Sequence, residues 1–308
     1  MMSYKAVCFG EVLWDNLPTG KKLGGAPLNV SYHLNRLGVS TAMLTRIGED
    51  ENGQEIEALC RDLGVPTALF QKDDVYPTST VEVQIGEDKE VHYEIVFPVA
   101  WDFIQTDAQG LDMVKNADFF VFGSLSSRNE VSYDTLIRLL EVANFKVFDV
   151  NLRTPFYTEE RVLELLSKAD LVKMNKAELQ KISSWTNLDM ERDVERVWAL
   201  MDIYQLQEAV ITYGAEGAVY YSKSLELVYH FPAYRVEIND TIGSGDSFLA
   251  AFLTKRFQTA EELLIEDVMD FSAMISGFVT QSSGACPPYD QNDIIRFQWL
   301  NPLYKAKY

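Results

Sequence analysis

The chain has 308 residues, of which 47% are hydrophobic and 12% aromatic, so it can bury one large core or two modest ones. Its formal net charge of −19 and the absence of a Lys/Arg cluster argue against a nucleic-acid partner bound through a basic face. The same charge opposes anionic ligands, so an anionic substrate needs a strong positive feature close by. Such a feature can prevail, because charges farther away than ~8 Å are largely screened at physiological salt.

The cysteines and the N-terminal residues indicate the cellular compartment of the protein. Cys8, Cys60 and Cys286 are far apart, have mostly apolar neighbours and show no zinc-site spacing, which favours buried free thiols. The first residues lack the charged start, apolar centre and cleavage site of a signal peptide. Because no apolar run is long enough to span a membrane either, we expect a cytoplasmic protein with no membrane partner.

The first part of the chain alternates short apolar strands with amphipathic helices. We expect a buried strand and a turn over 4–15, then a helix over 26–38 that has Pro27 in its first turn and Gly38 at its end. A strand over 39–48, a helix over 54–64 and a strand over 65–70 continue the pattern. This order is typical of βαβ units and a parallel sheet.

Residues 78–97 follow a different pattern, because apolar and polar residues alternate on both sides of the turn GEDKE. The pattern predicts an antiparallel hairpin. Its apolar face would place three residues opposite three others, namely Val81, Val83 and Ile85 against Val91, Tyr93 and Ile95. A lone hairpin cannot cover such a face, so we expect it to close over something as a lid.

Strands and helices alternate again in the rest of the chain. We expect strands over 118–124, 146–152, 171–175, 208–214, 217–222 and 226–233, and helices over 132–143, 159–168, 189–205, 246–257 and 260–282. No linker or repeat divides the chain. We therefore predict one α/β domain over 1–308, with a mostly parallel sheet covered on both faces and a small β lid formed by 78–97 with a contribution from the short loop 15–25.

The stretch DTIGSGDSF, residues 240–248, joins an alternating segment to an apolar helical one. Ligands bind open α/β sheets at the carboxyl ends of strands, and a helix that begins near Asp246 leaves its first N–H groups unpaired, with ~+0.5 charge there. Gly243 and Gly245 let a phosphate approach the backbone and, with Ser244 between them, turn N–H groups toward it. The stretch therefore predicts an anion hole, the local positive feature that the net charge requires.

Asp246 would repel a phosphate held in this anion hole, although a carboxylate is a good helix cap. A hydroxyl between them reconciles the two roles: Asp246, with an ordinary pKa of about 3.9, orients it and accepts its proton late, while the oxygen attacks the phosphoryl group. A plain cap at a glycine-rich turn is the alternative. The Walker pattern and the dinucleotide fingerprint are absent, and the histidines are too scattered for a metal centre: His33, His92 and His230.

These residues resemble a known family. DTIGSGDSF resembles the DTxGAGD signature of the ribokinase-like, PfkB-type carbohydrate kinases, with Ser244 in place of the usual alanine, and its detail is most similar to bacterial fructokinases. GGAPLNV, residues 24–30, resembles the second signature of the family. The resemblance implies that four residues hold sugar hydroxyls: Asp15, Gly24, Gly25 and Asn29. Their side-chain acceptors, donors and open backbone suit a polyol, although a turn, a tight loop and a helix cap would explain them too.

Further matches imply contacts for the nucleotide and for ions. MNKAE resembles the N-x-x-E motif, which implies that Glu178 organises the waters of Mg²⁺ while Asn175 lies near the triphosphate. TYGAEG resembles the turn beside ATP and implies three contacts: Thr212, Gly214 and Gly217. SSGA, residues 282–285, resembles a loop that binds a monovalent cation, K⁺, in many members, here through the backbone of Asp240, Ile242 and Gly284.

Two other stretches resemble fructokinases near the substrate. DVNLR implies that Arg153 lies near the transferred phosphate, with a surface arginine as the alternative. HYEIVFPVAWD implies that Tyr93 and Trp101 lie at the sugar. One departure concerns the lid: only eight residues separate Asp15 from Gly24, where ribokinases insert lid strands. We therefore expect a smaller lid and no dimer formed by clasping two full lids, while other homodimers remain open.

The resemblance covers about residues 4–290 and implies a three-layer α/β/α sandwich with a β lid. It also implies an ATP-dependent kinase that phosphorylates a small sugar, with fructose as the first expectation. Alternatives are 2-keto-3-deoxygluconate, ribose or another sugar, a nucleoside, and a non-catalytic sugar or nucleotide binder. Asp246 argues against the last, because binding alone needs no carboxylate beside an anion hole.

Overall fold

A nine-stranded sheet forms the centre of the protein in the computed structural model, which describes residues 4–17, 20–85, 91–258 and 264–301. The strand order is β13-β12-β11-β10-β9-β8-β1-β4-β5. β12 is antiparallel to both of its neighbours, and the other pairs are parallel. The strands are β1 (Lys5–Phe9), β4 (Ser40–Gly48), β5 (Phe70–Asp73), β8 (Phe119–Gly123), β9 (Lys146–Asp149), β10 (Leu171–Asn175), β11 (Glu208–Thr212), β12 (Ala218–Ser222) and β13 (Leu227–Phe231).

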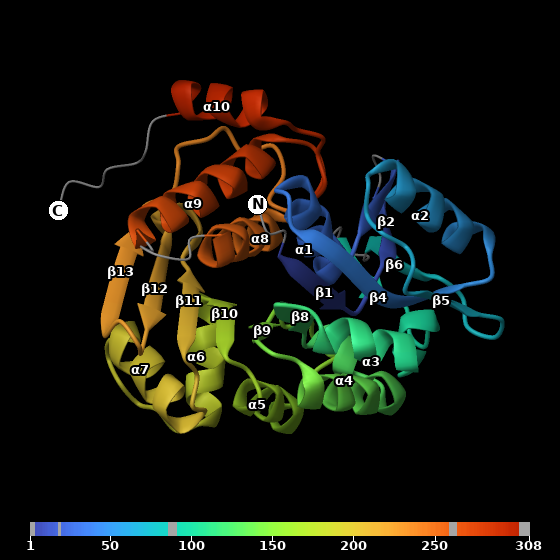
Figure 1. Ribbon diagram of the computed structural model, residues 1–308, viewed down its shortest axis with the longest axis horizontal. Coiled ribbons are helices and arrows are strands. Elements are labelled where there is room, and N and C mark those ends of the chain that lie inside the picture. Colours follow the sequence, from blue (N-terminus) through green and yellow to red (C-terminus); the bar gives the residue numbers. More distant parts are fainter. Residues whose placement is uncertain (1–3, 18–19, 86–90, 259–263, 302–308) are drawn as a thin grey trace.

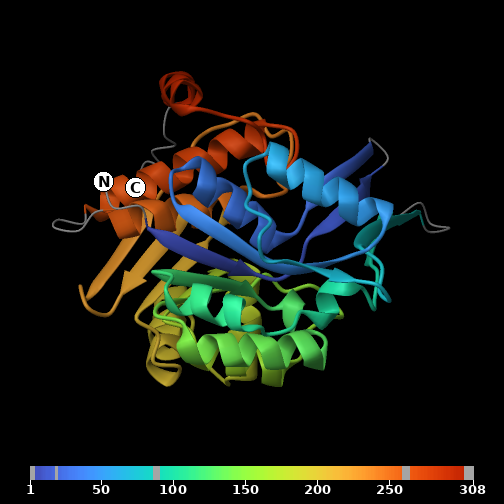
Figure 2. The same ribbon diagram turned by 45° about the vertical axis from the view of Figure 1, so that its right-hand side comes forward.

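Helices cover both faces of this sheet (Figures 1 and 2). One face carries α1 (Ala26–Arg36), α2 (Glu51–Asp62), α8 (Ser244–Gln258) and α9 (Ile265–Gln281), with α10 (Gln291–Leu300) outside α9. The other face carries α3 (Ala108–Lys115), α4 (Glu130–Val142), α5 (Glu159–Ser167), α6 (Lys176–Trp185) and α7 (Asp193–Ile203). A hydrophobic core fills each interface between helices and sheet, which confirms the predicted three-layer α/β/α fold.

Some boundaries differ from the predicted ones. The strand expected over 65–70 is β5 instead, because Phe70 donates its N–H to the Thr67 carbonyl in a turn before the chain joins β4. α8 begins at Ser244 rather than near Asp246. Three helices were not expected: α3 and α6 begin at side-chain caps, Asp107 and Asn175, and α10 begins at the cap Asp290.

A second sheet forms the lid, with the order β3-β2-β6-β7. Its strands are β2 (Leu13–Leu17), β3 (Gly20–Gly24), β6 (Ser79–Ile85) and β7 (Val91–Ile95). The predicted hairpin register is confirmed, since Val83 pairs with Tyr93 and the flanking pairs follow it. Its turn, 86–90, lies outside the described residues.

The expectation of a short loop over 15–25 is wrong. β2 and β3 pair antiparallel over this segment, from Leu13 opposite Gly24 to Leu17 opposite Gly20, and β2 also pairs parallel with β6. Two residues between antiparallel strands are enough for a hairpin, so eight residues after Asp15 suffice for lid strands. The lid is therefore larger than the sequence suggested.

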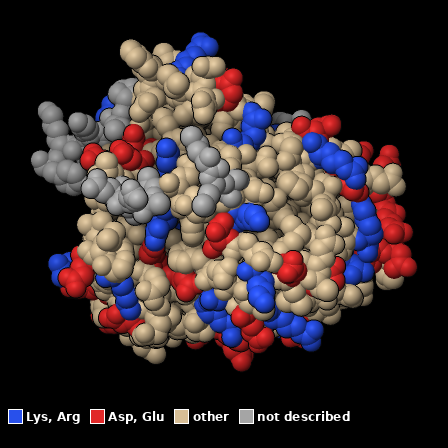
Figure 3. Space-filling model, in the orientation of Figure 1, with Lys and Arg blue, Asp and Glu red and all other residues tan. Residues whose placement is uncertain are grey.

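The surface shows no broad region of positive charge on the face in Figure 3, where Lys and Arg alternate with Asp and Glu. Within the described part of the chain, no helix combines the length and the apolar character that crossing a membrane requires.

Candidate active site

Polar side chains gather where the parallel strands end. Lys173 of β10 pairs in register with Asp149 of β9, and Asn175 pairs with Thr212 at the end of β11. Glu11 lies two residues after the end of β1. Carboxyl ends of parallel strands share one edge of a sheet, which is where ligands bind in open α/β folds. The start of α8 lies at the same edge, because a Cβ on Gly245 would be 2.9 Å from the Lys173 Nζ.

Asp246 lies in the first turn of α8, and its side chain contacts Asn29 in the first turn of α1. The Asn29 Nδ2 donates to the Asp246 Oδ2 at 2.8 Å, and the Cys286 Sγ donates to the Asn29 Oδ1 at 3.4 Å. Burial, followed by the nearby Asp149 carboxylate, raises the pKa of Asp246 to about 6, while Lys173 opposes the shift. The expected ordinary pKa is therefore wrong: Asp246 is ionised at neutral pH but is a stronger base than a typical aspartate.

The predicted anion hole lies on a turn that glycine alone fits. Gly243 has φ +77°, and a Cβ there would lie 2.6 Å from the Ala285 Cβ. The Ser244 N–H is partly engaged, since it donates to the Thr241 carbonyl at 3.3 Å. The N–H groups of Gly243, Gly245 and Asp246 have no acceptor among the described residues. These amides, rather than that of Ser244, are the ones open to an anion.

Lys173 is a functional candidate that the sequence analysis missed. It is buried, and its Nζ donates to the Asp149 Oδ1 at 2.9 Å. Although burial lowers it, the pKa of Lys173 is raised overall by Asp149, Asp246 and Glu178. A permanent positive charge therefore lies beneath the start of α8. The available signal was a lysine inside the apolar strand LVKMN, together with the Asp149 that ends the neighbouring strand.

The predicted sugar residues meet at the junction of β2, β3 and α1. A Cβ on Gly24 would lie 2.4 Å from the Asp15 Oδ2, and one on Gly25, which has φ +116°, would lie 2.4 Å from the Glu11 carbonyl oxygen. Burial raises the pKa of Asp15, and the charge of Arg153 is the main opposing effect. The two glycines therefore hold the backbone against both acidic residues, and Arg153 lies close enough to act on them.

Glu11 is a second functional candidate that the sequence analysis missed. The Ser126 Oγ donates to the Glu11 Oε2 at 2.5 Å, and the Glu11 N–H donates back to the Ser126 Oγ at 3.1 Å. Burial raises the pKa of Glu11, and both Arg153 and Asp246 act on it electrostatically. Glu11 thus belongs to the same charged cluster as Asp15 and Asp246.

The prediction that Trp101 contacts the sugar is wrong. Its side chain is fully buried in the 3₁₀ segment Ala100–Phe103, and the Arg128 guanidinium lies 4.0 Å from the ring centroid. Trp101 therefore supports the base of the lid from inside. Tyr93 lies on β7, and its side chain is outside the described part of the structure.

The two residues predicted near the triphosphate cap α6 reciprocally. The Glu178 N–H donates to the Asn175 Oδ1 at 2.9 Å, and the Asn175 N–H donates to the Glu178 Oε2 at 2.7 Å. The Leu152 N–H donates to the Glu178 Oε1 at 3.0 Å. Glu178 is thus held rigidly and keeps lone pairs for water, while the buried Asp149 Oδ2 nearby has no partner among the described atoms.

The predicted ATP turn follows β11. Gly214 has φ +59° and open space around it, whereas Gly217 has φ +102° and its Cβ would lie 2.0 Å from the Phe231 carbonyl oxygen. Gly217 is therefore required by packing, and Gly214 leaves room for a ligand beside Thr212.

The turn predicted to bind a monovalent cation is held together by Asp240. The Ile242 N–H donates to the Asp240 Oδ1 at 3.0 Å, and the Gly284 N–H donates to the Asp240 Oδ2 at 3.3 Å. The ammonium of Lys22, on β3 of the lid, lies 3.4 Å from the same Oδ2. The sequence analysis did not single out Lys22.

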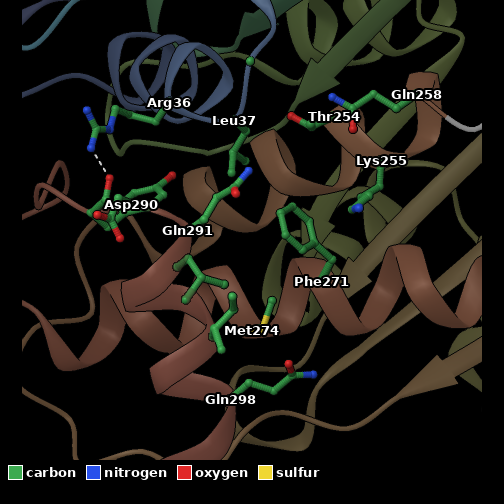
Figure 4. Close-up of a pocket in the computed structure, with 14 residues that line it drawn as sticks. Arg36, Leu37, Thr254, Lys255, Gln258, Phe271, Met274, Asp290, Gln291 and Gln298 are labelled. Carbon is green, nitrogen blue, oxygen red and sulfur yellow. Dashed lines mark hydrogen bonds between the residues drawn. The ribbon is translucent and has the colours of Figure 1, made fainter. Parts of the chain in front are cut away.

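A cavity of 460 Å³ lies apart from this site (Figure 4). Its walls include Leu37 after α1, Thr254 of α8, Phe271 of α9 and Gln291 of α10. Thr254 lies eight residues after Asp246, or about 12 Å along α8. The cavity is therefore at the other end of the helix from the anion hole.

A buried acid beside free amides at a helix start, with a small β-sheet next to a parallel sheet, is the arrangement expected of a lidded α/β phosphotransferase. Residues 3–292 match the profile of the pfkB family carbohydrate kinases, and the chain belongs to this family. It is 28% identical to fructokinase-2 of Solanum habrochaites, over 91% of this chain and 92% of the relative.

The solved structures that share the fold include two fructokinases. The fructokinase of Xylella fastidiosa with bound ATP superposes with a TM-score of 0.84 at 21% identity, over 97% of this chain and 99% of that one. A double mutant of the fructokinase of Vibrio cholerae O395, in its fructose-, ADP- and potassium-bound form, gives a TM-score of 0.81 at 22% identity, over 96% and 98% of the two chains.

Proposed function

We propose that this protein is an ATP-dependent fructokinase, which transfers the γ-phosphoryl group of ATP to a hydroxyl of fructose. The observation that carries the proposal is Asp246, a base of raised pKa held by Asn29 within one helical turn of free backbone amides. The family match supports a carbohydrate acceptor, and similar proteins named fructokinases favour fructose among the sugars.

In this proposal the sugar lies between the lid and the start of α8. Asp15, Asn29 and the backbone of Gly24 and Gly25 bind its hydroxyls. Asp246 orients the reacting hydroxyl and accepts its proton as the oxygen bonds to phosphorus and the bond to the ADP oxygen breaks. The amides at the start of α8, Lys173 and Arg153 stabilise the charge on the phosphoryl oxygens. Closure of the lid excludes water, so that ATP is not wasted by hydrolysis.

ATP would bind along the ends of β10 and β11, beside Asn175, Thr212 and Gly214. We propose Mg²⁺ as its counter-ion, held through water by Glu178 and by the unpartnered oxygen of Asp149, a donor set that fits a hydrated hard cation. When bound, the ion neutralises charge on the triphosphate.

We also propose a homodimer, for which light scattering of the purified chain is the test.

The test is a panel of sugars assayed for ADP release, with the phosphorylated position determined by NMR. We expect fructose to give the highest kcat/KM, and 2-keto-3-deoxygluconate, ribose and a nucleoside to be poorer. A higher kcat/KM for one of these would reassign the acceptor. No ADP release with any acceptor, despite binding of ATP, would favour a non-catalytic binder.

A further inference from the structure

The lid and the anion hole are joined by one lysine. Lys22 lies on β3, in register opposite Asp15, and its Nζ is 3.4 Å from the Asp240 Oδ2 and 3.3 Å from the Ser283 Oγ. Its aliphatic stem crosses the turn after α9, where a Cβ on Gly284 would be 3.8 Å from the Lys22 Cδ. These contacts link the lid to two turns that are 218 or more residues away in sequence.

Asp240 is the centre of this junction. Its Oδ1 accepts the Ile242 N–H, and its Oδ2 accepts the Gly284 N–H, so one carboxylate ties the turn before α8 to the turn after α9. The two turns pack tightly against each other, because a Cβ on Gly243 would lie 2.6 Å from the Ala285 Cβ. The shape of the anion hole therefore depends on the Asp240 carboxylate remaining in place.

The charge of this carboxylate has to be offset. Asp240 lies three residues before Gly243, so its negative charge opposes a phosphate at the start of α8. Its side chain is only 17% exposed, and water screens it incompletely. Among the described residues, Lys22 is the cation that pairs with Asp240. Lys22 also opposes the rise in the pKa of Asp15, so its charge acts on the predicted sugar residues as well.

We propose that the Lys22 ammonium, carried by the lid, takes the place of a monovalent metal cation at Asp240, so that the anion hole is ordered by lid closure and not by K⁺. This inference rests on the proposed function and deepens it. The ammonium lies against a carboxylate and a hydroxyl oxygen, ligands that a monovalent cation would also use. Lys22 is a positioning residue in this account, since it acts on the phosphate site through Asp240 and the turn.

The chain offers a matched control in the adjacent residue. Lys21, also on β3, points away from the site. Its Nζ lies 2.7 Å from the Asn52 Oδ1 and pairs with Glu55 of α2. The same Nζ lies 4.3 Å from the Trp14 ring centroid. Lys21→Met and Lys22→Met therefore remove the same charge from the same strand. Only Lys22→Met removes the charge that pairs with Asp240.

The experiment compares turnover of fructose and thermal stability in choline chloride and in KCl at equal ionic strength. We expect wild type and Lys21→Met to have the same kcat in both salts. Lys22→Met should lose about tenfold in kcat in choline chloride and recover most of it in KCl, with KM for fructose little changed. Its Tm should also rise in KCl, because the ion then binds the folded protein. The double variant Lys22→Met with Asp240→Asn should lose this response to KCl.

Three results would overturn the inference. The first is a several-fold activation of wild type by KCl, and the second is a Lys22→Met variant as active as wild type in choline chloride. The third is a Lys22→Met variant whose kcat and Tm do not change when KCl replaces choline chloride. If no variant phosphorylates any sugar, the proposed function fails, but the Tm comparison still decides the role of Lys22.

Discussion

At the scale of single residues, the proposed chemistry depends on Asp246, whose pKa is set first by burial and then by the charges around it. Asp149 repels the ionised Asp246, and Lys173 and Asn29 favour it. The raised pKa gives a base that is still ionised at neutral pH and accepts a proton more readily than an exposed aspartate.

The first prediction is therefore a pH profile. Because Asp246 has to be ionised to accept the proton, kcat should fall as pH drops through about 6 and should be level above it. Asp246→Asn should lower kcat by about 10²-fold to 10⁴-fold, abolish this inflection and leave ATP binding nearly intact. Steady-state kinetics against pH and calorimetry with ATP measure these effects.

Asp107→Asn is the control for this charge removal, since asparagine can cap α3 in place of Asp107. Near-normal turnover in Asp246→Asn would show that another group is the base.

A second prediction concerns the turn at Gly243. Gly243→Ala would place a methyl group against Ala285 and displace the free amides, so kcat should fall by about tenfold or more. Gly38→Ala is the matched control, because Gly38 has φ +91° but open space around it. Both changes should cost about 1–2 kcal/mol from the backbone strain alone. Equal kcat values in the two variants would contradict the assigned anion hole.

At the scale of elements, the base of the lid is fixed by one buried ion pair. Arg128 donates to both carboxylate oxygens of Asp102, at 2.7 and 2.8 Å, and to the Val96 carbonyl just after β7 at 2.8 Å. The two side chains are 2% and 0% exposed. The pair joins the 3₁₀ segment Ala100–Phe103 to the turn before α4.

The third prediction follows from this burial. Arg128→Met should lower the free energy of unfolding by about 3–5 kcal/mol, because it leaves the buried Asp102 carboxylate without a counter-charge, with only the Val99 N–H still donating to it. Arg192→Met, in the exposed pair with Glu195, should cost far less, because water screens that pair. Urea titration measures both. A loss in Arg128→Met no larger than in Arg192→Met would mean that this pair does not hold the lid.

At the scale of the whole molecule, the net charge of −19 acts on ATP but not on an uncharged sugar. A choline salt screens this long-range repulsion, whereas buried charges such as Lys173 are screened much less. Raising the salt from low to physiological concentration should therefore increase kcat/KM for ATP about twofold or more, with kcat/KM for fructose as the internal control. A decrease for ATP would show that exposed positive charges, such as Arg153, dominate its capture.

Much of the fold follows from local sequence. Alternation, helical periodicity and glycine ends predicted most strands and helices, because these patterns reflect which face of one element is buried. The sequence also predicts the anion hole and the role of Asp246, since two glycines and a carboxylate at a helix start have few conformations and few uses. The lid strands β2 and β3 were not predicted, because five residues each, LWDNL and GKKLG, carry too little pattern.

The sequence by itself determined the fold class and the hairpin register and predicted where a phosphate would bind, all of which depend on neighbours along the chain. Only the tertiary structure decided which charges meet: Asp149, Lys173 and Asp246 in one cluster, and Lys22 with Asp240 across the lid junction. It also decided that Trp101 is buried. The physical reason is that pKa shifts and ion pairs depend on burial and on distances between elements, which are set by strand order and by the position of the lid.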